Sequence, residues 1–147
     1  MDLQTIEDKL ELQELANKLF MYTDAGQWLL LEKEVFAKSV WFDMTSAGGE
    51  KPSLLPAREI CALWKNGFTG LDAVHHQAGH YLIDVQENAA AIFAYAIASH
   101  YKKAAQKGTN RIFVGSYDLK AIRSPQGWRL NQFKYNLKYM DGNTTLE

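Results

Sequence analysis

The sequence predicts an α+β fold in which helices pack on one face of a curved antiparallel β-sheet. Helical patterns occupy the first half of the chain, and long strands joined by short turns occupy the second half. Helices followed by a run of strands is the order typical of this class. The 147 residues are expected to form a single domain, 1–147, because the length suits one domain and the 47% hydrophobic content can supply its core.

The first helix is expected from about Thr5 to Asp24. Thr5 followed by Asp8 resembles a capping box, with Asp in place of the usual Glu. A wide apolar arc at helical spacing predicts a largely buried helix, through Ile6, Leu10, Leu12, Leu15, Ala16, Leu19 and Phe20. Asp24 lies one turn beyond Phe20, where the helix dipole disfavours a carboxylate. It therefore either has a function or simply begins the turn at 24–26.

The remaining elements follow from their periodicity and from the turn residues between them. A short helix is expected around Trp28 to Phe36, a strand at Val40 to Thr45 and a third helix at Ala57 to Phe68. Ala47 to Pro56, rich in Gly, Ser and Pro, is expected to be a mobile loop. Four long antiparallel strands of one sheet are predicted at 72–85, 89–102, 110–122 and 128–140.

The first two of these strands carry His76 and His100, with a tight turn at 86–88 between them. A turn centred on Asn88 places the two histidines directly opposite each other, and one centred on Glu87 makes them diagonal neighbours. Either register puts the two histidines on one face of the sheet. Their Cβ atoms would be about 5 Å apart as an opposite pair and about 7–8 Å apart as a diagonal pair. The surrounding inward positions are small, at Ala78, Ala94, Ala96 and Ala98, which indicates a pocket.

Three interpretations of the histidines are open. His75, His76, His80 and His100 could be metal ligands, but on a strand His76 and His80 are about 13 Å apart, which one zinc ion cannot bridge. Each could instead be a structural residue that satisfies a hydrogen bond. His75 has the opposite parity and is expected to face away, and His80 is expected at the pocket rim. The third interpretation is proton transfer by Asp24, His76 and His100, because histidine works as an acid or a base near neutral pH.

Composition excludes several classes. A net charge of −1 with scattered Lys and Arg gives no nucleic-acid footprint. The single Cys61 fits a reducing compartment, the polar segment at residues 1–4 is not expected to be a signal peptide, and no apolar run is long enough to span a membrane. We therefore expect a soluble cytoplasmic protein. Nucleophile-elbow, GxGxxG and P-loop motifs do not occur, so no cofactor is expected, and no metal.

Five segments together resemble the SnoaL-like branch of the nuclear transport factor 2-like superfamily. They are 22–28 (YTDAGQW), 40–44 (VWFDM), 76–80 (HQAGH), 127–130 (GWRL) and 141–143 (DGN). The resemblance covers nearly the whole chain. It implies a cone: a strongly curved antiparallel sheet wrapped around three N-terminal helices, with a deep apolar pocket inside.

Within that superfamily, the site residues are most similar to those of scytalone dehydratase and related dehydratases. The resemblance implies that Asp24, His76 and His100 are catalytic. Two tyrosines hold a water in those enzymes, and this chain has Thr23 and Met44 at the corresponding positions. The expected substrate-binding lining of the pocket is Phe20, Phe42, Met44, Trp64 and Ala98.

These expectations define a first hypothesis, a cofactor-independent lyase or isomerase of the dehydratase type. Its substrate would be a small apolar carbonyl compound, such as a polyketide- or steroid-like ring. Two alternatives are a non-catalytic protein that binds a small apolar molecule and a small subunit of a ring-hydroxylating oxygenase. A homodimer through the outer sheet face is expected, because Phe93, Tyr95, Ile97 and Tyr101, with Phe113 or Val114, form an apolar stripe there.

Overall fold

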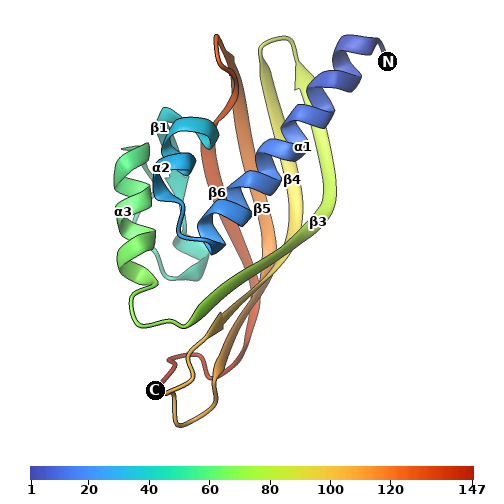
Figure 1. The fold of residues 1–147 in the computed structure, drawn as a ribbon. Coiled ribbons are helices and arrows are strands. Elements are labelled where there is room, and N and C mark those ends of the chain that lie inside the picture. Colours follow the sequence, from blue (N-terminus) through green and yellow to red (C-terminus); the bar gives the residue numbers. More distant parts are fainter.

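The computed structural model describes residues 1–147 and confirms the predicted α+β architecture (Figure 1). The helices are α1 (Leu3–Asp24), α2 (Trp28–Leu30), which continues into a π-helical turn η1 (Leu31–Val35), and α3 (Ala57–Gly67). A 3₁₀ turn, η2 (Thr45–Ala47), precedes α3. The strands are β1 (Phe36–Asp43), β2 (Ser53–Pro56), β3 (Ala73–Gln86), β4 (Ala89–Tyr101), β5 (Asn110–Ser124) and β6 (Gly127–Gly142). None of the helices combines the length and apolar character needed to cross a membrane.

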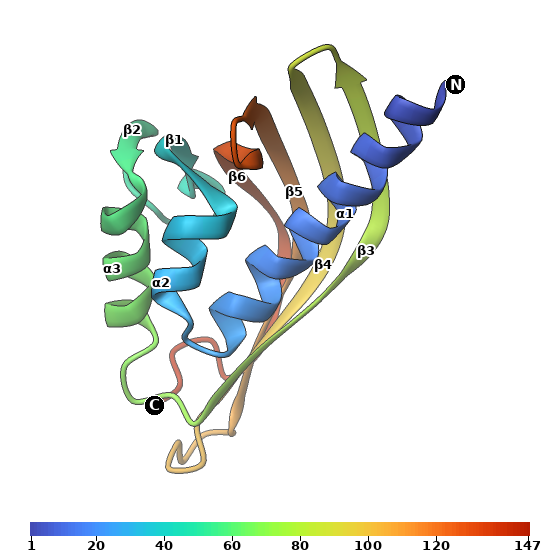
Figure 2. The ribbon, with the colours of Figure 1, turned by 45° about the horizontal axis from the view of Figure 1, so that its top comes forward.

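All six strands form one curved sheet in the order β2-β1-β6-β5-β4-β3, and Figure 2 shows the helices on one side of it. The four long strands pair antiparallel, as predicted. Two expectations were wrong. The segment expected to be a loop contains β2, which pairs with β1, and β1 runs parallel to β6. The sheet is therefore mixed. The strand expected at Val40 to Thr45 begins earlier, directly after the helical segment that ends at Val35, and is β1 (Phe36–Asp43).

The core lies between α1 and the inner face of the sheet. Leu12, Leu15, Ala16, Leu19 and Phe20 are buried at the spacing of one helix face. They belong to one buried cluster with inward residues of the strands, such as Leu119, Leu130 and Phe133. Each fully buried Leu contributes about 2 kcal/mol. The first turns of α1 are more open than expected: Ile6 and Leu10 are exposed, because they lie on the helix face opposite the buried Asp8 and Leu12.

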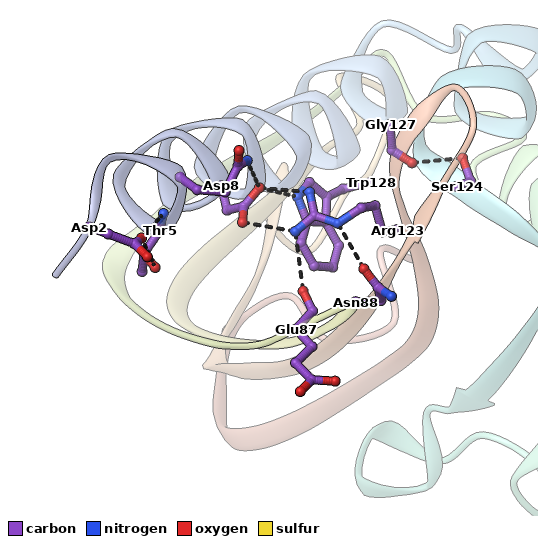
Figure 3. A network of polar contacts seen from close by, with 10 residues as sticks. Asp2, Thr5, Asp8, Glu87, Asn88, Arg123, Ser124, Gly127 and Trp128 are labelled. Carbon is purple, nitrogen blue, oxygen red and sulfur yellow. Dashed lines mark hydrogen bonds and ion pairs between the residues drawn. The ribbon is translucent and has the colours of Figure 1, made fainter.

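Asp8 does not form the expected capping box with Thr5. The N-cap is Asp2, whose carboxylate accepts a hydrogen bond from the Thr5 backbone N–H at 2.8 Å. Asp8 is buried and accepts hydrogen bonds from the Arg123 guanidinium at 2.8 and 2.9 Å and from the Trp128 indole at 3.2 Å (Figure 3). This pairing holds the pKa of Asp8 well below its usual range. It ties the start of α1 to the β5–β6 hairpin.

A β-bulge in β3 changes which residues face inward. Gly79 pairs with Tyr95 and Leu82 with Phe93, so two residues of β3 stand opposite the single Ala94. His80, the first of the two, has a left-handed φ of 54°. Its side chain is exposed and lies beside the Tyr95 ring, with centroids 5.7 Å apart. The expectation that His80 lies at the pocket rim was therefore wrong, because the bulge shifts the alternation of side chains.

The same bulge decides the pairing of the two predicted site histidines. The hairpin turn is Glu87–Asn88, between the paired residues Gln86 and Ala89. Beyond the bulge, His76 pairs with Ala98 and Val74 with His100. His76 and His100 are therefore diagonal neighbours on the inner face, which is the second of the two registers considered from the sequence.

Candidate active site

A cavity of about 120 Å³ lies at the inner face of the sheet, near the C-terminal end of α1. Its lining is mostly hydrophobic, and the three exceptions are Thr23, His76 and His100. Most of the lining consists of aromatic rings contributed by α1, the end of α3 and the central strands, and Ala98 of β4 is the one alanine among them. Its neighbours Ala96 and Gly115 pair with each other beside the cavity, and the Tyr135 ring fills the space above Gly115.

Asp24 and His76 form a hydrogen-bonded pair beside this cavity. The Asp24 Oδ1 atom lies 2.6 Å from His76 Nδ1, and the Asp24 Oδ2 atom accepts the His76 backbone N–H at 2.9 Å. Both side chains are mostly buried, 18% exposed for Asp24 and 10% for His76. These two hydrogen bonds offset the unfavourable position of a carboxylate at a helix C-terminus.

This contact determines the proton positions on the His76 ring. A carboxylate accepts, so Nδ1 carries a proton, and in the neutral ring Nε2 then carries the lone pair. The Nε2 atom makes no hydrogen bond within the protein, and His76 lines the cavity. The ring is packed against Phe20, with centroids 5.5 Å apart. The His76 side chain can therefore act as a base toward a molecule in the cavity.

The Nδ1 atom of His100 accepts hydrogen bonds, whereas that of His76 donates one. The donor is Arg111, a residue that the sequence did not single out. The Arg111 Nε and Nη2 groups donate to His100 Nδ1 at 3.2 and 2.8 Å. His100 is only 8% exposed. Burial, and then the positive charge of Arg111, lowers the pKa of His100 from 6.5 to about 4. The imidazole is therefore neutral at neutral pH.

Four of the five expected lining residues border the cavity: Phe20, Met44, Trp64 and Ala98. Phe42 does not. Its ring stacks on Phe133, with centroids 5.6 Å apart, and it borders a neighbouring surface groove instead. Asp24 lies behind His76 and is not part of the wall.

Other cavity residues were missed from the sequence, namely Phe68, Phe113, Tyr117, Phe133 and Tyr135. Arg111 and Phe113 have the same parity on β5, but the sequence alone does not fix the β4–β5 register and so does not show which face of the sheet they occupy. Their partners in the structure are His100 and Ala98. Knowledge of one contact within the 102–109 connection would have fixed the β4–β5 register, and with it the inward direction of Arg111 and Phe113.

The position expected for a water-holding tyrosine is occupied by Thr23, whose hydroxyl donates to the Leu19 carbonyl at 2.6 Å. Two tyrosines reach the cavity from other strands, Tyr117 on β5 and Tyr135 on β6. Burial raises the pKa of both hydroxyls, that of Tyr135 to about 12, so both are neutral. The Tyr135 hydroxyl is buried without a hydrogen-bond partner.

The histidines do not form a metal site. No three His, Cys, Asp or Glu side chains come close enough together to hold a metal ion. His75 faces away as predicted and is largely exposed, and its Nδ1 atom lies 4.0 Å from Asp24 Oδ2. The titratable imidazoles that line the cavity are those of the Asp24–His76 and Arg111–His100 pairs.

The chain was compared with known proteins. None of the curated proteins matches it. A solved structure of the Kfla4162 protein from Kribbella flavida is similar over 99% of this chain and 98% of that one, with 28% identity and a TM-score of 0.91. A Novosphingobium aromaticivorans protein named for a suggested scytalone dehydratase activity is 12% identical, with coverage of 93% and 88% and a TM-score of 0.77.

A nuclear transport factor 2-like superfamily protein from Salmonella enterica is 18% identical, with coverage of 92% and 94% and a TM-score of 0.76. The similarities to the Novosphingobium and Salmonella proteins concern the fold alone. The model of the SnoaL-like domain matches residues 4–134, which is most of the chain. With its helices on one face of a curved sheet and a cavity at their junction, the chain belongs to the SnoaL-like domain family.

Proposed function

We propose that the protein is a cofactor-independent lyase or isomerase that moves a proton on a small, apolar carbonyl compound. The 2.6 Å contact between Asp24 and the His76 imidazole, beside a mainly hydrophobic cavity, carries this proposal. Asp24 holds the ring in the tautomer with a basic Nε2 atom. An apolar cavity binds the carbon skeleton, and few polar groups remain to orient its oxygen.

The proposed reaction begins with transfer of a proton from the carbon next to the carbonyl to His76 Nε2. The C–H electron pair moves into a new C=C bond and the carbonyl π electrons move to oxygen, which gives an enolate. His76 is then an imidazolium paired with the Asp24 carboxylate. In a dehydration, the enolate re-forms the carbonyl and expels a β-hydroxyl, which leaves as water with the proton from His76. In the isomerisation of a β,γ-unsaturated ketone the intermediate is a dienolate; His76 returns the proton to its γ-carbon, the carbonyl re-forms and the remaining C=C bond lies between the α- and β-carbons.

Cavity size limits the substrate. A cavity of about 150 Å³ is known to hold benzene, and the present one is about 120 Å³. A compound with one six-membered ring is therefore the proposed substrate class. The fused rings of a steroid would require the walls to move, which makes the steroid-like substrate the less favoured part of the original expectation.

Two probes of this size test the proposal. Cyclohex-3-en-1-one isomerises, and 3-hydroxycyclohexan-1-one dehydrates, to the same conjugated enone, whose formation is followed by its ultraviolet absorbance. We expect turnover of at least one probe, and a loss of about 10²- to 10⁴-fold in His76→Gln. The matched control is His80→Asn on the same strand, since His80 is exposed outside the cavity and Asn tolerates its positive φ. Equal turnover in His76→Gln would refute the proposal.

A non-catalytic binding protein is the second candidate. It is favoured by one observation: the Thr23 hydroxyl already donates within α1 and is not free to hold a water as a tyrosine would. Native mass spectrometry of the purified protein would reveal a retained small molecule and its mass. A retained apolar ligand together with no turnover of either probe would favour this candidate over the enzyme.

We also propose a two-fold homodimer through the outer face of the sheet. Tyr95 and Ile97 of β4 are 46% and 50% exposed there, and Leu82 and Tyr139 on neighbouring strands are also exposed. Phe113 lines the cavity, so Val114 is the β5 residue beside this stripe. A symmetric interface would bury the same stripe on both chains.

A further inference from the structure

Arg111 and His100 face each other across neighbouring strands. They are paired residues of β5 and β4, and two guanidinium N–H groups converge on His100 Nδ1 at 3.2 and 2.8 Å. The guanidinium also lies 5.5 Å from the centre of the Phe113 ring, which restricts its position. A guanidinium only donates and does not lose its proton in proteins. The Nδ1 atom of His100 must therefore be the acceptor.

We propose that Arg111 is a positioning residue that holds His100 as a neutral imidazole with its proton on Nε2, so that His100 donates a hydrogen bond to a substrate oxygen. This inference rests on the proposed function and assigns the two histidines different roles. His76 donates through Nδ1 to a carboxylate and keeps a basic Nε2 atom. His100 accepts at Nδ1 and keeps an Nε2–H donor.

This arrangement places one proton acceptor and one hydrogen-bond donor at the same cavity wall. The His100 imidazole is neutral at neutral pH, so the donor does not have to change protonation before the substrate binds. The base can remove the α-proton while the donor stabilises the negative charge that develops on the carbonyl oxygen. The ligand class that fits is a neutral ring compound with a carbonyl or hydroxyl oxygen within reach of His100.

Charged and titratable groups act on His100 from three elements. Arg111 approaches from β5, His76 from β3 and Asp24 from the end of α1. Burial is the largest influence that disfavours protonation of His100, Arg111 and His76 act in the same direction, and Asp24 opposes them. The other packed neighbours, Phe68 and Phe113, are apolar. The balance favours the neutral ring that the Arg111 contact requires.

Direct binding of a substrate anion by Arg111 is the competing role. Arg111 does not line the cavity, and two of its N–H groups are already directed at His100. Its effect on a bound molecule would therefore pass through the imidazole. This difference makes the inference testable on the ring of His100 itself.

The experiment is a long-range ¹H–¹⁵N spectrum of the protein labelled with ¹⁵N-histidine, because the ¹⁵N shifts distinguish the two tautomers and the protonated ring. His100→Asn assigns the His100 signals. We expect the Nε2–H tautomer at neutral pH and on acidification until close to the pKa of about 4. In Arg111→Gln, we expect a mixture of tautomers and a titration midpoint raised by about one unit or more, toward the ordinary value.

Arg129→Gln is the matched control, because Arg129 donates to the backbone carbonyls of Lys33 and Trp128. It should leave the His100 spectrum unchanged. A protonated ring or an Nδ1–H tautomer in the wild type at neutral pH would overturn the inference, even if Arg111→Gln does not fold. An unchanged His100 spectrum in a folded Arg111→Gln variant would overturn it as well. These outcomes do not depend on turnover, so they are separate from failure of the proposed function.

Discussion

Acid should destabilise the protein through His100. This side chain is buried and neutral in the folded protein, with its pKa lowered by burial and by Arg111 to about 4. In the unfolded chain it takes up a proton near its ordinary value of 6.5. Between these two values the unfolded state binds more protons than the folded state, so the free energy of unfolding decreases as the pH falls.

The expected magnitude follows from the two pKa values. At about 1.4 kcal/mol per pKa unit, the shift from 6.5 to about 4 corresponds to about 3 kcal/mol. This contribution to the free energy of unfolding is fully present above pH 6.5. It is lost as the pH falls from 6.5 to about 4 and changes little below that. A loss of this size is a large part of the roughly 5–15 kcal/mol that stabilises a typical domain.

Urea unfolding at a series of pH values from 7 to 4 measures this loss, with His100→Asn as the matched variant. Asparagine does not titrate, and its side-chain oxygen can accept a hydrogen bond from Arg111 in place of Nδ1. Carboxylates elsewhere affect both proteins equally. The stability difference between wild type and variant should therefore shift by about 3 kcal/mol against the wild type over this range. Parallel stability curves would refute the reasoning.

Three further predictions concern the frame of the site and its assembly. Asp8→Asn should lower the free energy of unfolding by about 2 kcal/mol, because it weakens the buried hydrogen bonds from Arg123 and Trp128. A free energy of unfolding in urea within about 0.5 kcal/mol of the wild-type value would contradict this. Gly115→Ala should destabilise by more than about 1 kcal/mol, because the new Cβ would lie 2.2 Å from the Asn136 carbonyl, whereas Gly67→Ala meets open space and should be tolerated. Tyr95→Lys should weaken the proposed dimer in sedimentation experiments, and the exposed Leu29→Lys on α2 should not; equal assembly of all three proteins would exclude this interface.

The sequence predicts the helices and the long strands well, because their patterns are long and periodic. Alternation along β4 places Ala90 to His100 inward at every second residue, and the structure has the same alternation. The apolar stripe of Tyr95 and Ile97 on the opposite face follows from the same pattern. A face assignment of this kind requires only local geometry.

Features that depend on contacts between distant segments were not predictable. The bulge at His80 requires a left-handed backbone at a residue other than glycine, so alternation continued through it gives the wrong face. The parallel pairing of β1 with β6 joins segments far apart in the chain, and a four-residue strand such as β2 carries little pattern of its own. Arg111 reaches His100 only because the β4–β5 register places them side by side.

The central claim is that His76, oriented by Asp24, removes a proton next to a carbonyl. Its most direct test is deuterium exchange at the α-carbons of cyclohexanone in D₂O, followed by ¹H NMR with wild type, His76→Gln, Asp24→Asn and the His80→Asn control. We predict that wild type and His80→Asn accelerate exchange, that His76→Gln loses this activity, and that Asp24→Asn loses most of it because the tautomer is no longer fixed. Exchange at the wild-type rate in His76→Gln, or no acceleration by a wild-type protein that binds cyclohexanone, would contradict the account.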